Sequence, residues 1–248
     1  MERPSSTPAI PTTGMPGVSE LIKDSIEIVK KRPGFFFSIA AVPAILYFIG
    51  QLIVAINPFL FLWFIPFLLL GMIAGVFAGI ATIKGLADDK MSDWKQAYSE
   101  STKLFWPLIW SAILVTVVVF IGLILLVIPG LYLSIVFSFY MFALILDNAR
   151  GWNAAEKSKQ LVKGYWWSVF GRLIALGLIL TVIMGILSIV IGMTGSNVAY
   201  AVFNLIITIV ITPFGAAYSY LMYKSLQDIK GKSGNSSQPE QPAVMPTA

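Results

Sequence analysis

The sequence contains no cysteine and no histidine, and only 12% of its 248 residues are charged. Without cysteine, the chain can form neither disulfides nor thiolate centres. Without histidine, it lacks the commonest general base and the commonest ligand of transition metals. Soluble domains are about one quarter charged, so this chain has too few polar residues to cover a water-facing surface. We therefore predict an integral membrane protein that is not an enzyme and holds no metal or cofactor.

Hydrophobic residues make up 57% of the sequence, and they lie in long uncharged runs. A bilayer core about 30 Å thick requires roughly 20 apolar helical residues to cross it. Six runs of that order are Phe35–Ile56, Pro58–Ile83, Leu104–Ile128, Leu131–Leu146, Leu173–Ile191 and Ala199–Tyr223. The fourth run is short, and the fifth reaches full length if its helix begins at Trp166. The predicted fold is all-α, with six transmembrane helices.

The two ends of the sequence differ in composition from the part between them. Residues 1–17 and 231–248 are rich in Pro, Ser and Thr or in Gly, Ser and Gln, with no apolar core. Such segments cannot bury enough apolar surface to fold. We expect two disordered tails that flank one membrane domain, residues 18–230.

Charged residues occur only in alternate connections between the predicted spans. The turns containing Asn57–Pro58, Pro129–Gly130 and Gly192–Asn197 carry no charge, whereas every lysine after the first span lies in the other connections or beyond the last span. Basic residues close to span ends stay in the cytoplasm, so both termini and the two longer loops are predicted to be cytoplasmic. The net charge of +5 therefore indicates a membrane surface as the partner, and not nucleic acid.

Aromatic residues mark where two of the spans enter the membrane. Trp106, and the run Tyr165, Trp166 and Trp167, stand between lysine and the apolar part of a span, as interfacial anchors do. Arg172 lies about 9 Å deeper in the fifth span. Its long side chain can return to the lipid phosphates or form an ion pair with Asp147, at the end of the fourth span.

One unit recurs three times along the chain. The stretches "ELIKDSIEIVKKRPGFFFSI", "DWKQAYSESTKLFWPLIW" and "AAEKSKQLVKGYWWSVFG" each place a polar–apolar helix and a lysine before an aromatic cluster. The predicted architecture is therefore three repeated hairpins, each preceded by a short interfacial amphipathic helix. The first such helix, 18–31, either lies among anionic headgroups or packs on a neighbouring helix. Lys31, Lys103, Lys163 and Arg172 are the predicted phosphate-facing residues.

The stretch Val127–Leu180 resembles a known family. Its "IPGLYL", the serines and aromatics that follow, and "LVKGYWW" are similar to the six-span membrane domain of some bacterial glycerophosphodiester phosphodiesterases and of stand-alone prokaryotic membrane proteins. The resemblance implies a six-span fold in the inner membrane of a prokaryote. It implies no activity here, because the hydrolytic domain of those relatives is a separate soluble barrel that uses histidines.

Three functional hypotheses arise from the sequence. The first is a scaffold, anchor or lipid-associated protein acting on the cytoplasmic face, with anionic lipid, a protein partner or a second copy of the chain as its partner. The second is a transporter or channel for a small neutral or lipid-like solute, supported by prolines within spans and by their Ser and Thr content. The third, an intramembrane enzyme, is disfavoured because the chain has no histidine, no cysteine and no buried acid pair. For Gln51 and Asn204 we expect polar contacts between helices. A cation site at Asp88, Asp89 and Asp93 is weighed against a solvated loop, which the neighbouring lysines favour.

Overall fold

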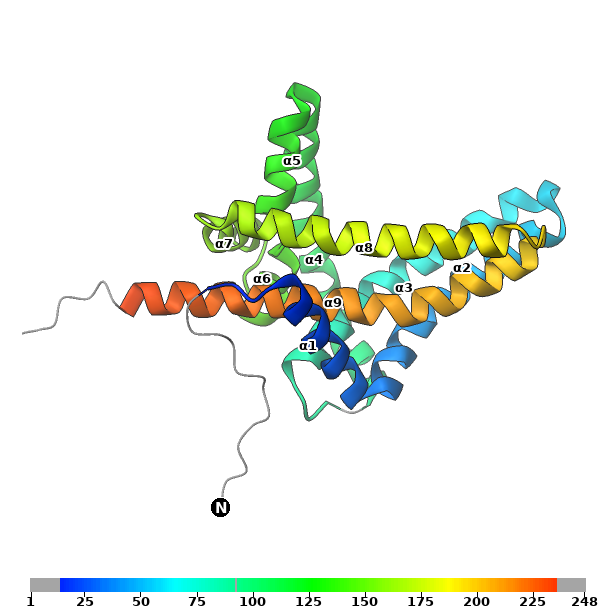
Figure 1. Ribbon diagram of the computed structural model, residues 1–248, viewed down its shortest axis with the longest axis horizontal. Coiled ribbons are helices and arrows are strands. Elements are labelled where there is room, and N and C mark those ends of the chain that lie inside the picture. Colours follow the sequence, from blue (N-terminus) through cyan, green and yellow to red (C-terminus); the bar gives the residue numbers. More distant parts are fainter. Residues whose placement is uncertain (1–13, 92, 236–248) are drawn as a thin grey trace, which may run out of the picture.

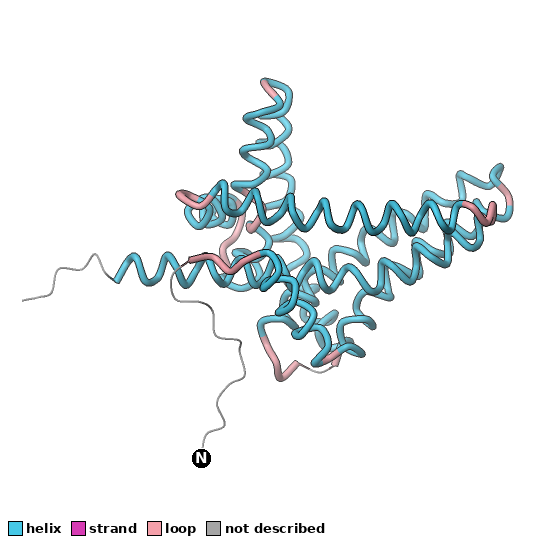
Figure 2. Tube along the Cα trace, in the orientation of Figure 1, coloured by secondary structure: helices cyan, strands magenta, loops and turns pink. Residues whose placement is uncertain are grey.

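The computed structural model describes residues 14–91 and 93–235, with side chains as far as residue 231, and this part of the chain contains helices and short loops but no strand (Figures 1 and 2). The helices in chain order are α1 (Val18–Lys31), α2 (Pro33–Ile56), the 3₁₀ turn η1 (Pro58–Leu60), α3 (Phe61–Ala87), α4 (Trp94–Leu125), α5 (Val127–Val136), α6 (Tyr140–Asp147), α7 (Trp152–Val162), α8 (Trp166–Gly192) and α9 (Asn197–Asn235).

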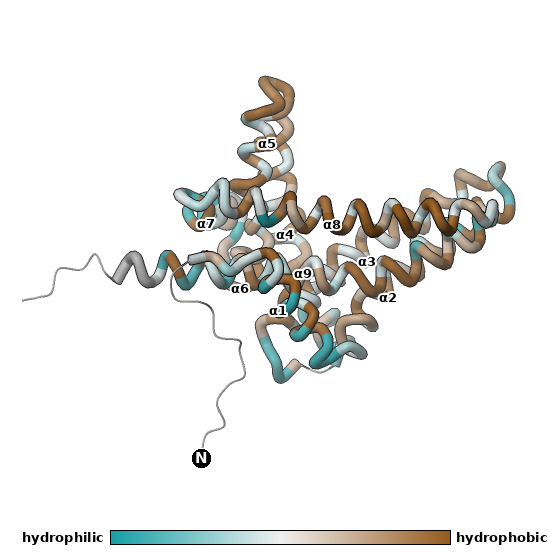
Figure 3. Tube along the Cα trace, viewed as in Figure 1, coloured by the Kyte–Doolittle hydropathy of each residue, from teal (hydrophilic) through white to brown (hydrophobic). Residues whose placement is uncertain are grey.

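Six segments of the described chain are long and apolar enough to cross a membrane, which confirms the predicted all-α membrane class. They are Pro33–Ile56, Pro58–Ala87, Trp94–Leu125, Val127–Asp147, Trp166–Gly192 and Asn197–Gly231. Hydrophobic residues cover α8 and the projecting α4–α5 hairpin, whereas hydrophilic residues gather on α1 and in the α3–α4 connection (Figure 3). The outer surface is thus apolar along the spans, as lipid requires.

The helices do not form one parallel bundle: the α2–α3 and α8–α9 hairpins extend in the same direction, and the α4–α5 hairpin diverges from them (Figure 1). The helices α2, α3 and α9 pack together, with α9 lying along α2, whereas α8 contacts α9 much less. The α4–α5 hairpin projects in another direction. The largest group of buried apolar residues lies at the centre and includes Leu144, Val162 and Tyr223, from α6, α7 and α9.

The predicted helix before each hairpin exists in two of the three units. Helices α1 and α7 are separate, but the second unit has none, because α4 runs unbroken from Trp94 into its span. The second and third units differ in the residue that follows the shared lysine. Gly164 adopts φ +87° and turns the chain there, whereas its counterpart Leu104 has a side chain that makes such a conformation costly. The expectation of three interfacial helices is therefore wrong for the middle unit.

The fourth predicted span is two helices. α5 ends at Val136 and α6 begins at Tyr140, so backbone groups between them are left without their helical partners. Ser158 of α7, fully buried, supplies replacements: its hydroxyl donates to the Val136 carbonyl (2.7 Å) and accepts from the Phe139 N–H (3.1 Å). α7 is consequently built into the protein, and it does not lie free on the membrane surface.

Helix α1 is also packed into the protein and does not lie free on the membrane surface. Its apolar face carries Leu21, Ser25 and Val29, which are all buried, and packs mainly on α9. Of the two placements left open by the sequence, packing on a neighbouring helix is the one the structure contains, and the lysines of α1 still face outward. At the other end of the chain α9 continues helical to Asn235, into the segment predicted as a tail from residue 231. Residues 1–13 and 236–248 lie outside the described part.

Candidate functional site

A cavity of about 440 Å³ lies between α1, α8 and α9, and is called here the α1/α8/α9 groove. On α8 it extends from Leu176 to Ile183, about 10 Å along the helix axis. Its lining residues are Ile22, Ser25, Ile26, Lys30, Leu176, Ile179, Leu180, Ile183, Ile211, Phe214, Gly215 and Tyr218. The hydroxyl of Ser25 is used by its own helix, where it donates to the Leu21 carbonyl (2.5 Å). The groove is therefore an apolar slot, with room for part of one hydrocarbon chain.

Three features of the sequence leave this space open. The side chains of Ile22 and Ile26 flank the face of α1 that packs on α9, so they border the groove without filling it. Gly215 has no side chain, and nothing lies within 4 Å of where its Cβ would be. Tyr218 is held back because its hydroxyl donates to the Arg172 carbonyl (3.0 Å).

The charge beside the groove is positive. Lys30 lines it, and Lys23 lies two helical turns earlier on the same flank of α1. At about 100° per residue, Glu27 lies within about 60° of both lysines and Glu20 within about 60° of Lys23, on the side of the lysines turned away from the groove. Within the described part of the chain, neither Lys23 nor Lys30 forms an ion pair. An anion at the mouth would meet two ammonium groups that have carboxylates as neighbours but no ion-pair partner.

The guanidinium of Arg172 binds backbone carbonyls of the protein itself. Its Nε donates to the Pro16 carbonyl and its Nη2 to the Met15 carbonyl, both at 2.8 Å, while Nη1 donates to Ser168 of its own helix at 2.9 Å. The guanidinium thus pins the segment before α1 onto α8. These carbonyls hold three of its donors, and its role at the lipid phosphates remains a prediction.

The expected ion pair between Asp147 and Arg172 is wrong. Asp147, at the end of α6, instead pairs with Lys157 of α7 (Nζ–Oδ2 2.9 Å). It also accepts hydrogen bonds from two residues of α9, the Tyr223 hydroxyl and the Gln227 amide (Nε2–Oδ2 3.0 Å). This cluster ties three helices together on the charged side.

The three predicted phosphate-facing lysines lie on different elements. Lys31, at the end of α1, is 3.7 Å from Glu27, while Lys103 on α4 and Lys163 after α7 have exposed side chains. None of the three lines the groove. They remain predicted lipid contacts of the surface, separate from the groove.

The predicted aromatic anchors divide into two kinds. Trp106 and Trp167 are about three-quarters exposed, as residues that meet lipid headgroups would be. Trp166 turns inward, stacks on Tyr132 (5.5 Å between ring centroids) and donates from Nε1 to the Tyr132 carbonyl (3.2 Å). Tyr165 lies under the ammonium of Lys230 (5.5 Å). The pair of adjacent tryptophans therefore has one ring facing outward and one fastening α5 to α8.

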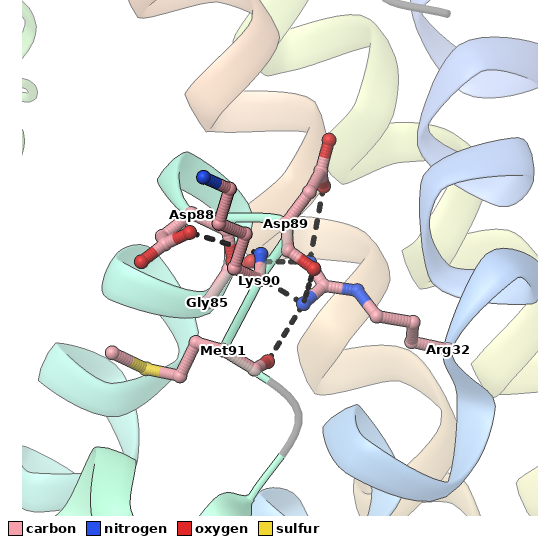
Figure 4. Close-up of polar contacts among 6 residues, drawn as sticks. All are labelled: Arg32, Gly85, Asp88, Asp89, Lys90 and Met91. Carbon is pink, nitrogen blue, oxygen red and sulfur yellow. Dashed lines mark hydrogen bonds and ion pairs between the residues drawn. The ribbon is translucent and has the colours of Figure 1, made fainter.

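Arg32 is the main contact that sequence reasoning missed. Its guanidinium enters the loop after α3 and donates to the carbonyls of Gly85 (2.5 Å) and Met91 (2.8 Å), with longer contacts to Asp88 and Asp89 (Figure 4). Carbonyls at a helix C-terminus lack partners within the helix, so a cation there is stabilising. The only signal in the sequence was an arginine directly before the first span.

The aspartates weighed as a cation site have separate uses. Asp89 pairs with Arg32 (3.3 Å), and Asp88 accepts from the N–H of Lys90 (2.9 Å). Asp93 caps α4 by accepting from the N–H of Lys95 (2.9 Å). The structure shows these residues as loop and helix caps.

A second cavity, of about 420 Å³, lies at the opposite ends of the spans. Its lining residues are Gln51, Val54, Ala55, Pro58, Phe61, Phe64, Asn197, Tyr200 and Ala201, from α2, η1, α3 and α9. The Oε1 atom of Gln51 is buried and has no hydrogen-bond partner among the described residues. Asn204 does not bridge helices as expected, because its amide donates to the Tyr200 carbonyl of its own helix (3.0 Å).

Searches of protein-family models, curated proteins and solved structures found no match to this chain. Any functional conclusion therefore rests on the geometry described above.

Proposed function

We propose that the chain is a non-catalytic, multi-pass protein of a prokaryotic cytoplasmic membrane that binds anionic phospholipid and acts as an anchor or scaffold on the cytoplasmic face. The groove takes an acyl chain of one lipid, and the phosphate of that lipid meets Lys30 and Lys23. Both termini, α1, α7 and the α3–α4 loop lie in the cytoplasm in this arrangement, as the distribution of lysines requires.

One observation carries the proposal: an apolar slot and a pair of unpaired lysines occur together at the end of the spans where the chain keeps its charges. An acyl chain gains free energy by leaving lipid only if it fills a surface that fits it, so shape matters more than hydrophobicity here. The ammonium groups add preference for a negative headgroup, since basic residues near an anionic leaflet are each worth about 1 kcal/mol. The family resemblance agrees with this location and adds no reaction.

The test compares lipid retention by charge variants. The wild type and a Lys23→Gln/Lys30→Gln variant are placed in nanodiscs of equal phosphatidylglycerol and phosphatidylcholine, released, and examined by native mass spectrometry. A Lys90→Gln/Lys95→Gln variant, which removes the same charge from the α3–α4 connection, is the matched control. We expect the wild type and the control to retain phosphatidylglycerol, and the α1 variant to lose that preference. Equal retention by all three would refute the groove as an anionic-lipid site.

The apolar part of the groove has its own test. Gly215→Leu fills the slot, whereas Gly177→Leu adds the same side chain on α8, where nothing lies within 4 Å and where the residue does not line the groove. We expect only the first variant to retain less lipid of either headgroup. If both variants retain lipid as the wild type does, no acyl chain occupies the groove.

A transporter or channel for a small neutral solute is the second candidate, and the cavity at Gln51 favours it. A buried acceptor without a partner costs about 1–3 kcal/mol, so a solute that carries an N–H or O–H donor would be stabilised there. Flux of neutral hydroxylated solutes into sealed vesicles, compared between the wild type and Gln51→Leu, tests this function. Flux equal to that of protein-free vesicles would exclude it.

A further inference from the structure

The turn between α4 and α5 is built for surroundings without water. Leu126 is the one residue between the two helices, and both of its backbone polar groups are paired: its N–H donates to the Gly122 carbonyl (3.1 Å) and its carbonyl accepts from the Gly130 N–H (3.3 Å). Pro129, in the first turn of α5, has no N–H to leave unpaired. These features reduce the number of backbone groups that need water at this tip, which leaves the last carbonyls of α4 and the first two N–H groups of α5.

The side chains of the tip are apolar without exception. From Gly122 to Leu131 no side chain carries a polar atom. The five residues from Ile124 to Ile128 are nevertheless 67–81% exposed. A turn that emerges into water would leave all of this surface wet, at a large cost in hydrophobic free energy.

The other two hairpin turns differ from this one. In the α2–α3 turn, the side chain of Asn57 accepts a hydrogen bond from the Phe59 N–H (3.0 Å). In the α8–α9 turn, Thr194 donates to the Ile191 carbonyl (2.7 Å), and Ser196 accepts from the Ala199 N–H (3.2 Å). Polar side chains cap both of these turns, as is usual where the backbone meets water.

The reach of the hairpin is the second, independent observation. Where α5 ends, the carbonyl of Val136 is bonded to Ser158 of the charged helix α7. Closer to the tip, Tyr132 is stacked on Trp166, at the start of α8. From the level of Ser158 to the tip there are only the 10 residues of α5, or about 15 Å. The other arm is longer: from Leu104, next to Lys103, to Leu125 there are 22 residues of α4, or about 33 Å, against a hydrocarbon core about 30 Å thick. The reach of the hairpin across the bilayer therefore depends on its tilt.

Figure 1 shows that the hairpin is not aligned with α8 and α9 but projects away from them, which shortens its reach across the bilayer. We propose that α4–α5 is a re-entrant hairpin: it enters the membrane from the cytoplasmic side, turns within the hydrocarbon and returns without reaching the outer surface. The partner of its exposed face is the acyl chains of the inner leaflet. Its sidedness rests on the cytoplasmic placement of α7 in the proposed function.

A re-entrant hairpin makes no crossing and a spanning hairpin makes two, but both leave the two ends on the same side, so the sidedness of the other helices is unchanged. The length and composition of the two segments would allow two crossings, so the distribution of charge alone does not separate these arrangements. The depth of the tip in the membrane separates the two arrangements.

The chain has no cysteine, so single cysteines report one position each. Phe59→Cys and Met193→Cys place a thiol at the two capped turns, Ile128→Cys places one at the tip, and Lys90→Cys marks the α3–α4 loop. All four side chains are exposed, so none of the changes disturbs packing. Spheroplasts are treated with a membrane-impermeant maleimide, and detergent-solubilised samples provide the maximum reaction of each site.

We expect Phe59→Cys and Met193→Cys to react from outside, and Ile128→Cys to react at least about tenfold more slowly until detergent is added, because a thiolate forms poorly in hydrocarbon. A bimane label at Ile128→Cys should be quenched most by lipids brominated deep in the acyl chain. Outside reaction of Ile128→Cys at the rate of the capped turns would overturn the re-entrant hairpin. A tip shielded from both the maleimide and the brominated lipids would overturn acyl chains as its partner and point to protein instead.

The same set separates failure of the hairpin from failure of the proposed orientation. If Lys90→Cys reacts from outside and the two capped turns do not, then the cytoplasmic placement of α1 and α7 in the proposed function is wrong. The hairpin is then still judged by Ile128→Cys, which must be protected from maleimide on both faces of inverted and right-side-out vesicles.

Discussion

The hydroxyl of Ser158 accepts a hydrogen bond from the backbone N–H of Phe139 at 3.1 Å, and so joins α7 to the start of α6. The same oxygen donates to the Val136 carbonyl at 2.7 Å, on the other side of the break. One side chain from a charged helix thus replaces the helical hydrogen bonds that the interrupted span has lost.

Replacing this hydroxyl should destabilise the protein. Ser158→Ala leaves a buried N–H and a buried carbonyl without partners, and we expect a loss of about 1–3 kcal/mol in unfolding free energy. Thermal unfolding in detergent, followed by circular dichroism, measures the change. Ser134→Ala is the control, because that hydroxyl bonds only within its own helix, to the Leu131 carbonyl. Equal stability of the two variants would mean that the break does not depend on Ser158.

Arg172 should be irreplaceable by lysine. Its planar guanidinium reaches the adjacent carbonyls of Met15 and Pro16 through two different nitrogens, and a single ammonium cannot reproduce this fork. We expect Arg172→Lys to increase hydrogen exchange of the backbone from residue 17 into the first turns of α1, with the protection of α6 unchanged. Lys163→Gln, which removes a nearby charge, should leave α1 protected. Increased hydrogen exchange of α6 in Arg172→Lys would instead indicate that Arg172 interacts with Asp147.

Gly85 should not tolerate a methyl group. A Cβ at this position would meet the ring of Phe35, with its Cζ atom at 2.7 Å, and the ring is itself buried between α2 and α3. Overpacking of this kind costs about 1–3 kcal/mol, so Gly85→Ala should lower the melting temperature. Gly177→Ala, in open surroundings, should raise it slightly through helix propensity. The prediction fails if both alanines stabilise the protein.

The docking of α1 should strengthen as the pH falls. Burial, and after it the negative charges of Glu20 and Glu27, raise the pKa of Asp24 above its usual 3.8. A carboxyl group with a raised pKa in the folded state destabilises that state when ionised. The contribution of Asp24 to stability is therefore fully present below pH 3.8, and it is lost as the pH rises through the raised pKa.

Asp24→Asn removes this titration and should make the protection of α1 from hydrogen exchange independent of Asp24 over that pH interval. The comparison is made with the wild type after correction for the intrinsic exchange rate at each pH. Glu156→Gln, on α7, is the control and should follow the wild type. A wild-type α1 that loosens as the pH falls would contradict the sign of the effect.

Much of the fold could be predicted from local composition, because bilayer thickness and backbone hydrogen bonding leave few choices to an apolar run of 20 residues. The spans, the amphipathic face of α1 and the interfacial exposure of Trp106 and Trp167 follow from patterns within a few turns of chain. The break between α5 and α6 does not, since the residue that permits it is Ser158, 19 residues after Phe139.

The partners of the two arginines were beyond sequence reasoning for a related reason. Arg32 and Arg172 bind backbone carbonyls, and every residue offers the same carbonyl, so no side-chain pattern marks the target. Charge complementarity predicts Asp147 as the partner of Arg172, whereas the structure has the Pro16 carbonyl. The groove was equally hidden, because it depends on how α1, α8 and α9 are placed relative to one another.

The contact between α1 and α9 sets an order for assembly. α1 is among the first segments to leave the ribosome, yet the face that buries Leu21 and Val29 belongs mainly to the last helix of the chain. Until α9 has been synthesised, α1 lacks the main surface that covers its apolar side. The helix α1 of the first repeated unit is therefore covered by α9 of the third unit. A chain that stops before α9 should leave α1 on the bilayer as a peripheral helix.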